Sequence, residues 1–365
     1  MDNSFIALGL MSGTSLDGID ASIIKSDGQD KLEIIDNKYL SYSNEFKEKL
    51  YSFIQNIHKK TDIQENILTY RSLERELTLY HSKISQNIIN HNNCKIQLIG
   101  FHGQTIVHKP KDGYSIQMGD ANLLSQVLKE KVIYNFRTND INNSGEGAPL
   151  TPIYHKLLIK KFKIINPVLI LNIGGISNYT YCFRDKIEAK DVGPGNVLID
   201  EYLKKTKGIN FDKNGAIASS GNINQDIINQ FYEHEFYNAE EKHSYDRKEF
   251  DIGFVKGLEF EDAVATLTYF TALIITKNIK KNFENEIEII LCGGGRRNLT
   301  LVNHLRNLLK CKIKLIDEFD IDGDFVESQA FAYLSIRSYL KKIISYPKTT
   351  NVTKPVTGGE IIKNF

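Results

Sequence analysis

The sequence predicts an α/β fold built as two lobes with a cleft between them. Apolar, strand-like runs alternate with helical segments over 365 residues, which is more than one hydrophobic core usually holds. A strand–glycine turn–strand pattern occurs at residues 5–24 and again at 168–183, about half a chain apart. No sequence identity links the two hairpins, so a duplication is suggested by their pattern alone. Strands alternating with helices in two halves favour two lobes.

The composition limits the partners that the chain can have. It is 41% hydrophobic and 25% charged, and 46 Lys and Arg against 45 Asp and Glu leave a net charge of +1. We therefore expect no nucleic acid partner, because affinity for a phosphate backbone needs clustered cations. No run approaches the roughly 20 apolar residues of a membrane helix, and the N-terminus lacks a signal-peptide pattern, so no membrane is expected.

The cysteines and histidines favour a cytoplasmic protein without a zinc site. The four cysteines are widely spaced and form no CxxC pair, as expected for reduced, structural thiols. The nine histidines lack the spacing of zinc ligands.

The first lobe is expected over residues 1–130, with the tail 343–365 packed back on it. Strands are expected at 5–11, 18–24, 30–42 and 96–100, and helices at 44–58 and 62–92. The segment “FHGQTIVHKP” is expected to be a loop. The segment “YSIQMGDANLLSQVLKE” then predicts a strand, a turn and a helix, with Asp120 or Asn122 near the helix start.

The second lobe is expected over residues 131–342. Its expected strands are 131–136, the hairpin 168–183, “AKDV”, 287–291 and 312–316. Its expected helices are 150–161, one that follows “GPGN” with Pro194 in its first turn, 259–282, 298–309 and 325–342.

Four loops rich in Gly, Ser, Thr or Asn follow apolar strands, at residues 12–15, 174–178, 193–196 and 293–295. Glycine lets backbone N–H groups approach an anion, and a helix N-terminus adds a favourable dipole. Any one of these loops is more simply a tight turn, but four of them favour a nucleotide cleft. The P-loop, protein-kinase, G-x-G-x-x-G and G-x-S-x-G motifs are absent.

The remaining nucleotide fold is that of the actin, sugar-kinase and heat-shock ATPase superfamily, in which each lobe offers a hairpin to the phosphates. Seven motifs make the resemblance specific: “GLMSGTSLDGID”, “FHGQTI”, “NIGGISN”, “DVGPGN”, “DKNGAIASSG”, “CGGG” and “VTGG”. With these motifs the chain resembles the anhydro-N-acetylmuramic acid kinase family from about residue 5 to residue 359.

The resemblance implies a kinase that uses ATP and Mg²⁺ in cell-wall (peptidoglycan) recycling. Such an enzyme opens 1,6-anhydro-N-acetylmuramic acid with water and phosphorylates O6, giving N-acetylmuramic acid 6-phosphate. The implied ATP-binding residues are Gly13, Thr14, Ser15, Leu16, Asp17, Gly18, Ile19, Asp20, Gly174, Gly175, Asn178, Gly293, Gly294 and Gly295. Asp17 or Asp20 can reach Mg²⁺ through water, or can only fix the turn.

The resemblance also implies the catalytic and sugar-binding residues. Asp191 matches the carboxylate that deprotonates water; the alternative is that it caps the following helix. Glu327, Gln104, Arg137 and Asn196 are the expected substrate contacts, although Glu327 could form an ion pair and Gln104 could stabilise its loop. Phe331 and Leu334 put Glu327 on an inward helix face, whereas His102 is expected to be structural.

Two departures from the family pattern leave alternatives open. Asn139 stands where an arginine is common, and Glu146 replaces a glutamine. An asparagine cannot hold a lactyl carboxylate as a bidentate arginine does, so a kinase for a related amino sugar is one alternative. A nucleotide-dependent conformational-switch ATPase and an inactive binding protein are others. The oligomeric state is open, with a homodimer common for such folds.

Overall fold

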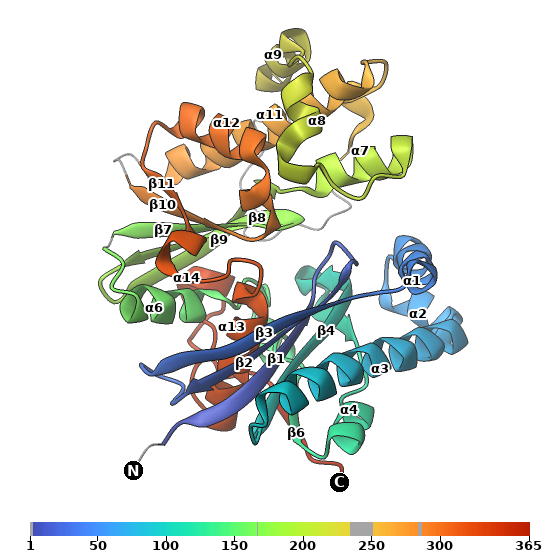
Figure 1. Ribbon diagram of the computed structural model, residues 1–365, viewed down its shortest axis with the longest axis vertical. Helices are drawn as coiled ribbons and strands as arrows, with labels where there is room; N and C mark the ends of the chain where they lie inside the picture. The colour runs from blue at the N-terminus through green and yellow to red at the C-terminus, as the bar shows by residue number, and fades with distance from the viewer. Residues whose placement is uncertain (1–2, 166, 234–250, 284–286) are drawn as a thin grey trace. The chain divides into compact units, whose positions relative to one another are not determined.

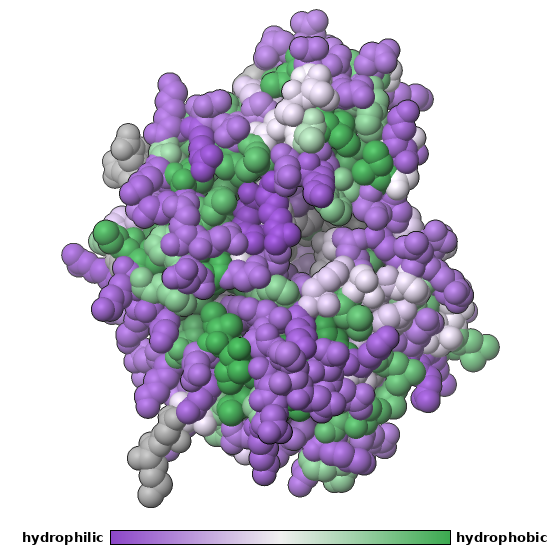
Figure 2. Space-filling model, in the orientation of Figure 1, coloured by the Kyte–Doolittle hydropathy of each residue, from purple (hydrophilic) through white to green (hydrophobic). Residues whose placement is uncertain are grey.

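The computed structural model describes residues 3–165, 167–233, 251–283 and 287–365, and its contacts divide the chain into two units. Unit 1 contains residues 1–164 and 325–365, and unit 2 contains residues 165–324. Each unit is built on its own β-sheet (Figure 1). On the face shown in Figure 2, hydrophilic side chains predominate and hydrophobic ones form separate patches. None of the helices in the described ranges combines the length and the hydropathy needed to span a bilayer.

The sheet of unit 1 has the strand order β12-β6-β4-β1-β2-β3, with β5 paired to β4. Its strands are β1 (Phe5–Ser12), β2 (Gly18–Ser26), β3 (Leu32–Ser41), β4 (Leu98–Lys109), β5 (Tyr114–Met118), β6 (Lys131–Tyr134) and β12 (Glu360–Ile362). Strands β1, β4 and β6 are parallel to one another. Their carboxyl ends therefore meet at one edge of the sheet, where ligands commonly bind in α/β proteins.

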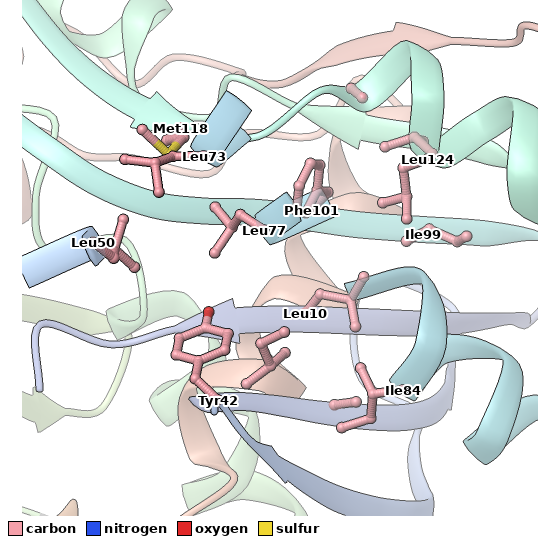
Figure 3. Close-up of a cluster of buried hydrophobic side chains, with 14 of the residues drawn as sticks. Leu10, Tyr42, Leu50, Leu73, Leu77, Ile84, Ile99, Phe101, Met118 and Leu124 are labelled. Carbon is pink, nitrogen blue, oxygen red and sulfur yellow. The ribbon is translucent and has the colours of Figure 1, made fainter. Parts of the chain in front are cut away.

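One face of this sheet is covered by helices from the first third of the chain. These are α1 (Asn44–Asn56), α2 (Lys60–Glu65), α3 (Ile67–Asn92) and α4 (Ala121–Leu128). In Figure 3, Leu10, Leu77 and Phe101 point into the same apolar core, between the sheet and α3. Caps fix where helices start: the side chain of Ser43 accepts a hydrogen bond from Phe46 N, and that of Asp120 from Leu123 N.

The other face of the sheet carries α13 (Val326–Tyr339). The hydroxyl groups of Ser22 on β2 and Ser328 on α13 are 2.6 Å apart, whereas the next residue of β2, Ile23, lies in the core with α3. A Cβ on Gly9 would stand 1.9 Å from the carbonyl oxygen of Ser328, and one on Gly100 would stand 2.1 Å from that of Phe331. These two glycines allow the helix backbone to lie directly on the strands.

The observed division corrects the predicted lobe boundaries at 130 and 342. Residues 131–164, including α5 (Thr138–Asn142) and α6 (Pro152–Lys161), belong to unit 1, and so does α13. The physical reason is pairing and packing, since β6 completes the first sheet and α13 packs on it. In the tail, α14 (Pro347–Thr350) precedes β12, which pairs antiparallel with β6.

The sheet of unit 2 has the order β11-β10-β7-β8-β9. Its strands are β7 (Val168–Ile173), β8 (Ile176–Phe183), β9 (Lys186–Pro194), β10 (Glu288–Cys292) and β11 (Ile313–Leu315). One face packs on α11 (Phe260–Asn282) and α12 (Leu299–Leu309) through an apolar core. A second core joins α11 to α7 (Val197–Lys207), α8 (Ala216–Ser220) and α9 (Gln225–Glu233).

Two local predictions differ from the structure. The segment “FHGQTIVHKP” is mostly strand, because β4 runs on to Lys109 and pairs there with β5. Pro194 ends strand β9 and is not in the first turn of a helix, since α7 begins at Val197. In both places pairing with a neighbouring strand outweighs the local turn signal.

Candidate functional site

The first glycine turn joins β1 to β2 at the carboxyl edge of the unit 1 sheet. It is shorter than the predicted phosphate loop: Gly13–Asp17 form the turn, and Gly18 to Asp20 already pair within β2. Leu16 closes the turn in a left-handed conformation, with φ of 60° and its side chain buried. Thr14 and Ser15 are exposed, so the polar part of the turn faces outward.

The two carboxylates of this segment have different surroundings. Asp17 forms an ion pair with Lys47 of α1, which holds the turn. Asp20 lies two residues before Ser22 and therefore on the sheet face that carries α13. Mg²⁺ typically takes one or two carboxylates, with water and phosphate oxygens completing its shell. No cluster of three His, Cys, Asp or Glu side chains suited to a metal occurs in the described ranges.

A buried hydrogen-bond network supports the end of β1. The hydroxyl of Ser12 donates to Oε1 of Gln104 at 2.6 Å and lies 2.7 Å from the hydroxyl of Tyr42. Gln104 is only 1% exposed. Burial raises the pKa of Tyr42 well above its ordinary value, so the hydroxyl keeps its proton. Among the two interpretations of Gln104, this geometry favours the structural one.

Arg137 stands just after β6 and fixes the segment that follows it. Its Nη1 donates to the carbonyl of Gly147 at 2.7 Å, and its Nη2 lies 2.8 Å from Nε2 of His102. Nδ1 of His102 donates to the carbonyl of Gly103 at 2.8 Å. Burial, together with the Arg137 charge, holds the pKa of His102 well below its ordinary value. His102 is thus a neutral histidine with both nitrogens bonded, as expected.

The two departures from the family pattern both contact the tail of unit 1. Asn139 donates from Nδ2 to the carbonyl of Thr357 at 2.6 Å. Oε1 of Glu146 accepts from the amide of Asn351 at 3.1 Å.

Glu327 lies in the first turn of α13, as predicted. The far end of the helix binds the β2–β3 turn, since Arg337 donates to the carbonyl of Gly28 at 2.8 Å. Glu327 is therefore at the opposite end of the sheet, with the Gly13–Asp17 turn. Helix α13 has no single inward face that would mark Glu327, because it is buried on almost all sides.

A cavity of about 190 Å³ opens within unit 1, lined by residues of β4 and β5, by Tyr134 at the end of β6 and by Asn135 after it. His102, which binds Arg137, lines it as well.

The second glycine turn, in unit 2, is joined to the start of α7. The carbonyl of Gly175 accepts from the N–H groups of Gly195 (2.9 Å) and Val197 (3.2 Å), and that of Gly174 accepts from Asn196 N at 2.8 Å. A Cβ on Gly195 would lie 2.2 Å from the carbonyl oxygen of Gly174. The amides of Gly195, Asn196 and Val197, the first residue of α7, are thus bonded to the turn, which fixes the turn to the helix start.

Asp191 lies within β9 and is 8% exposed. The N-cap position of α7 is Asn196, so Asp191 does not cap that helix. Its cross-strand partner on β8 is Asn178, which lies in the strand and not in the turn. Directly after Asp191, Val192 bulges out of the register, and its carbonyl accepts from Nδ2 of Asn278 on α11 at 2.9 Å.

The third glycine segment, Gly293 to Gly295, leaves the carboxyl end of β10 beside the second turn. A Cβ on Gly295 would stand 2.2 Å from Cγ2 of Ile173, and one on Gly294 would stand 3.9 Å from Nδ2 of Asn196. The turn, Asn196 and the Gly293–Gly295 segment therefore converge at one edge of the unit 2 sheet.

Arg296, which sequence reasoning did not identify, holds this segment in place. It is 2% exposed and binds both carboxylate oxygens of Asp317, at 2.6 and 2.8 Å, and also Asp324. Burial alone would lower the pKa of Arg296, but these hydrogen bonds raise it. In return, the guanidinium holds the pKa of Asp317 below its ordinary value.

The motif “DKNGAIASSG” also meets this edge, and no role was predicted for it. Asp212 accepts from the N–H groups of Ile217 (2.9 Å) and Ala218 (3.0 Å). The carbonyl of Gly215 accepts from Oγ1 of Thr300 on α12 at 2.8 Å. The Asp-x-x-Gly spacing was the available signal, because it is typical of a helix-starting turn.

Comparisons with known proteins cover nearly the whole chain. The family model described as anhydro-N-acetylmuramic acid kinase matches residues 5–364. The chain is 47% identical to a protein of that name from Pelagibacter ubique (strain HTCC1062), over all of both chains. It is 38% identical to a protein of the same name from Zymomonas mobilis, over 98% of this chain and 99% of that one.

Solved structures are more distant. One is the activator of 2-hydroxyisocaproyl-CoA dehydratase from Clostridium difficile with bound ADPNP, at 12% identity and a TM-score of 0.45. That match covers 91% of this chain and 94% of the activator.

Proposed function

The chain belongs to the anhydro-N-acetylmuramic acid kinase family, and from this premise we propose how its residues act. The substrate is 1,6-anhydro-N-acetylmuramic acid, and the products are N-acetylmuramic acid 6-phosphate and ADP. The reaction belongs to peptidoglycan recycling, and we assign it to the cytoplasm, where ATP is available. The observation that carries the proposal is the buried carboxylate of Asp191 on a bulged strand beside the turns of unit 2.

In the proposed reaction, Asp191 takes a proton from water as the water oxygen attacks C1 of the sugar. The bond between C1 and the bridging oxygen breaks, and its electron pair stays on that oxygen, which remains attached to C6. This O6 then bonds to the γ-phosphorus of ATP, and the bond from that phosphorus to the bridging β–γ oxygen breaks, releasing ADP.

The glycine segments are proposed to contact the nucleotide. The turns Gly13–Asp17 and Gly174–Gly175 supply backbone N–H groups to phosphates, and Gly293 to Gly295 lie at the adenosine. Mg²⁺ would be held by phosphate oxygens and, through water, by Asp20, and it would neutralise phosphate charge. The ion pair with Lys47 supports a structural role for Asp17.

The sugar is proposed to bind Glu327, Arg137 and Asn196. The position of Glu327 at the carboxyl edge of the unit 1 sheet, and the cavity beside His102 and Arg137, support this proposal. The alternative of another amino sugar gains no support from Asn139 or Glu146, because both are engaged by the tail.

The test incubates the protein with ATP, Mg²⁺ and the anhydro sugar in ¹⁸O-water. We expect label at the C1 hydroxyl of the product and none in its phosphate, measured by mass spectrometry. Asp191→Asn should lower kcat roughly 10²- to 10⁴-fold, whereas Asp185→Asn, at an exposed site between β8 and β9, should not.

Three outcomes would contradict parts of the proposal. Turnover unchanged in Asp191→Asn would remove that residue from the mechanism. Label in the phosphate would exclude attack of water on the sugar. An equal kcat/KM for the anhydro sugar without its lactyl group would favour the related-sugar kinase, and ATP hydrolysis at the full rate without sugar would favour the switch ATPase.

A further inference from the structure

Asn178 carries a buried hydrogen-bond acceptor without a partner. Its Oδ1 is inaccessible to solvent and has no hydrogen bond to any part of the chain that the structure describes. An unsatisfied buried acceptor destabilises a fold, so such groups are rare and often have a functional reason. The turn that Asn178 follows does not require it, since the turn is held by the carbonyls of Gly174 and Gly175.

The register places this acceptor beside Asp191. Asn178 on β8 is directly opposite Asp191 on β9. Side chains directly opposite in an antiparallel pair lie on the same face, with Cβ atoms roughly 4.5–5.5 Å apart. The bulge at Val192 follows at once, and bulges beside active sites fix the direction of a side chain.

A water molecule that attacks carbon needs its second hydrogen held as well as its first. Two oxygen acceptors of one water, each about 2.8 Å from its oxygen, stand roughly 4.4 Å apart. The cross-strand spacing of Asn178 and Asp191 suits that separation. A carboxylate alone leaves the other O–H free to rotate, which spoils the alignment of the attacking lone pair.

We propose that Oδ1 of Asn178 accepts the second O–H of the water that Asp191 deprotonates. This inference rests on the proposed function. One proton of the water passes to Asp191 as its oxygen bonds to C1, and the electron pair of the broken C1–O bond stays on O6. The other proton remains on the new C1 hydroxyl, hydrogen-bonded to Asn178. The residue thereby positions the nucleophile, instead of contacting a phosphate as its motif implied.

The test replaces the nucleophile. Methanol has a single O–H, so it has no second hydrogen for Asn178 to hold. In water–methanol mixtures with ATP and the anhydro sugar, the products are the free sugar 6-phosphate and its methyl glycoside. In Asn178→Leu we expect kcat for hydrolysis to fall roughly 10- to 100-fold, with the KM for ATP unchanged. The ratio of methyl glycoside to free sugar should rise at least about fivefold.

Two further variants keep the test decisive. Asn178→Asp retains an acceptor but adds a negative charge beside Asp191, so the acidic limb of the kcat/KM profile should move to higher pH. Asn222→Leu, which removes an exposed asparagine of unit 2, should leave rate and ratio as in the unaltered protein. If Asn178→Leu does not fold, Asn178→Ala, which also removes the acceptor, provides the same product ratio.

The proposal is overturned if hydrolysis and methanolysis fall equally, or if only the KM for ATP rises, as a phosphate contact predicts. Failure of the proposed function is separate, since the unaltered protein would then give no sugar phosphate, or Asp191→Asn would retain full turnover.

Discussion

A histidine buried in unit 1 shows how one residue can make the fold sensitive to pH. His81 of α3 is 0% exposed, and its Nδ1 donates to the carbonyl of Leu77 at 2.8 Å. Its Nε2 has no partner in the described ranges, and its ring packs edge-on against Phe101. Burial lowers the pKa of His81 to about 4. The imidazole is therefore neutral in the folded protein.

We predict that His81 destabilises the fold as the pH falls from 6.5 to about 4. In that window the unfolded chain takes up a proton at His81 but the folded chain does not. The free energy of unfolding therefore decreases as the pH falls. The contribution of His81 over the window is about 3 kcal/mol. His81→Leu should remove that part of the decrease, measured by urea denaturation at several pH values.

The control is His91→Gln, at an exposed position of the same helix, which should follow the unaltered protein. Parallel curves for His81→Leu and the unaltered protein would show that His81 does not contribute.

At the scale of an element, the contact of α13 with the unit 1 sheet depends on the absence of two side chains. Gly9 and Gly100 are paired neighbours on β1 and β4. The helix contacts these glycines through its backbone. A hydrogen-bond network adds to the contact: Ser328 of α13 bonds Ser22, and Oδ1 of Asn37 accepts from Ser22 at 2.7 Å and from Gln329 of α13 at 3.1 Å. Because Glu327 begins this helix, the same contact sets its position.

We predict that Gly9→Ala destabilises unit 1 by about 3 kcal/mol, since the added methyl group meets backbone atoms of Ser328 and Ala332 that cannot move separately. In the part that remains folded, the KM for the sugar should rise through displacement of Glu327. Thermal denaturation and kinetics measure the two effects.

Gly113→Ala is the comparison, because its φ of 82° is left-handed, unlike the strand conformation of Gly9, and nothing lies within 4 Å of the added Cβ. It should lose only about 1–2 kcal/mol, from backbone strain alone. A loss in Gly9→Ala no larger than this would contradict a dominant effect of the close approach to α13.

The sequence predicts elements well where the signal is local. Apolar runs and glycine turns were sufficient for the hairpins β1–β2 and β7–β8, and of the two residues expected near the start of α4, Asp120 and Asn122, Asp120 is the N-cap. The continuation of β4 past Gly100 was missed, because its polar residues resemble a loop until β5 pairs with them.

Sequence motifs predicted which residues belong to the candidate site, but not how those residues are arranged. They named Asp191 and the glycine segments, but the register of Asn178 with Asp191 depends on how two strands pair. The partners of Arg296 lie 21 and 28 residues away, and no local pattern shows such contacts. The lobe boundary was missed for the same reason, since α13 is assigned by packing against Gly9 and Gly100.

At the scale of the whole molecule, the tail is part of the unit 1 sheet. Gly359 has a φ of 81°, and a Cβ there would lie 2.7 Å from Ile133 of β6 and 2.9 Å from the Ser338 hydroxyl. We predict that Gly359→Ala loosens the tail from β6. Amide hydrogen exchange at residues 131–134 should become at least about tenfold faster, which corresponds to about 1.4 kcal/mol.

Exchange at β7 and β10 should not change, because those strands belong to unit 2. Gly208→Ala, a left-handed glycine of unit 2 with nothing within 4 Å, is the control and should leave β6 protected. Faster exchange throughout both sheets in Gly359→Ala would contradict the independence of the two units.

Unit 1 is formed by two stretches of the chain, residues 1–164 and 325–365, which are synthesised at different times on the ribosome. Residues 165–324 form a complete unit and can begin to fold while the chain is still being extended, since domains generally fold as units during translation. Unit 1 must wait for α13 and β12, which are translated last of its elements. Its 164 earlier residues therefore emerge first but finish folding last, and during that interval the β1–β4 surface with Gly9 and Gly100 is not yet covered by α13.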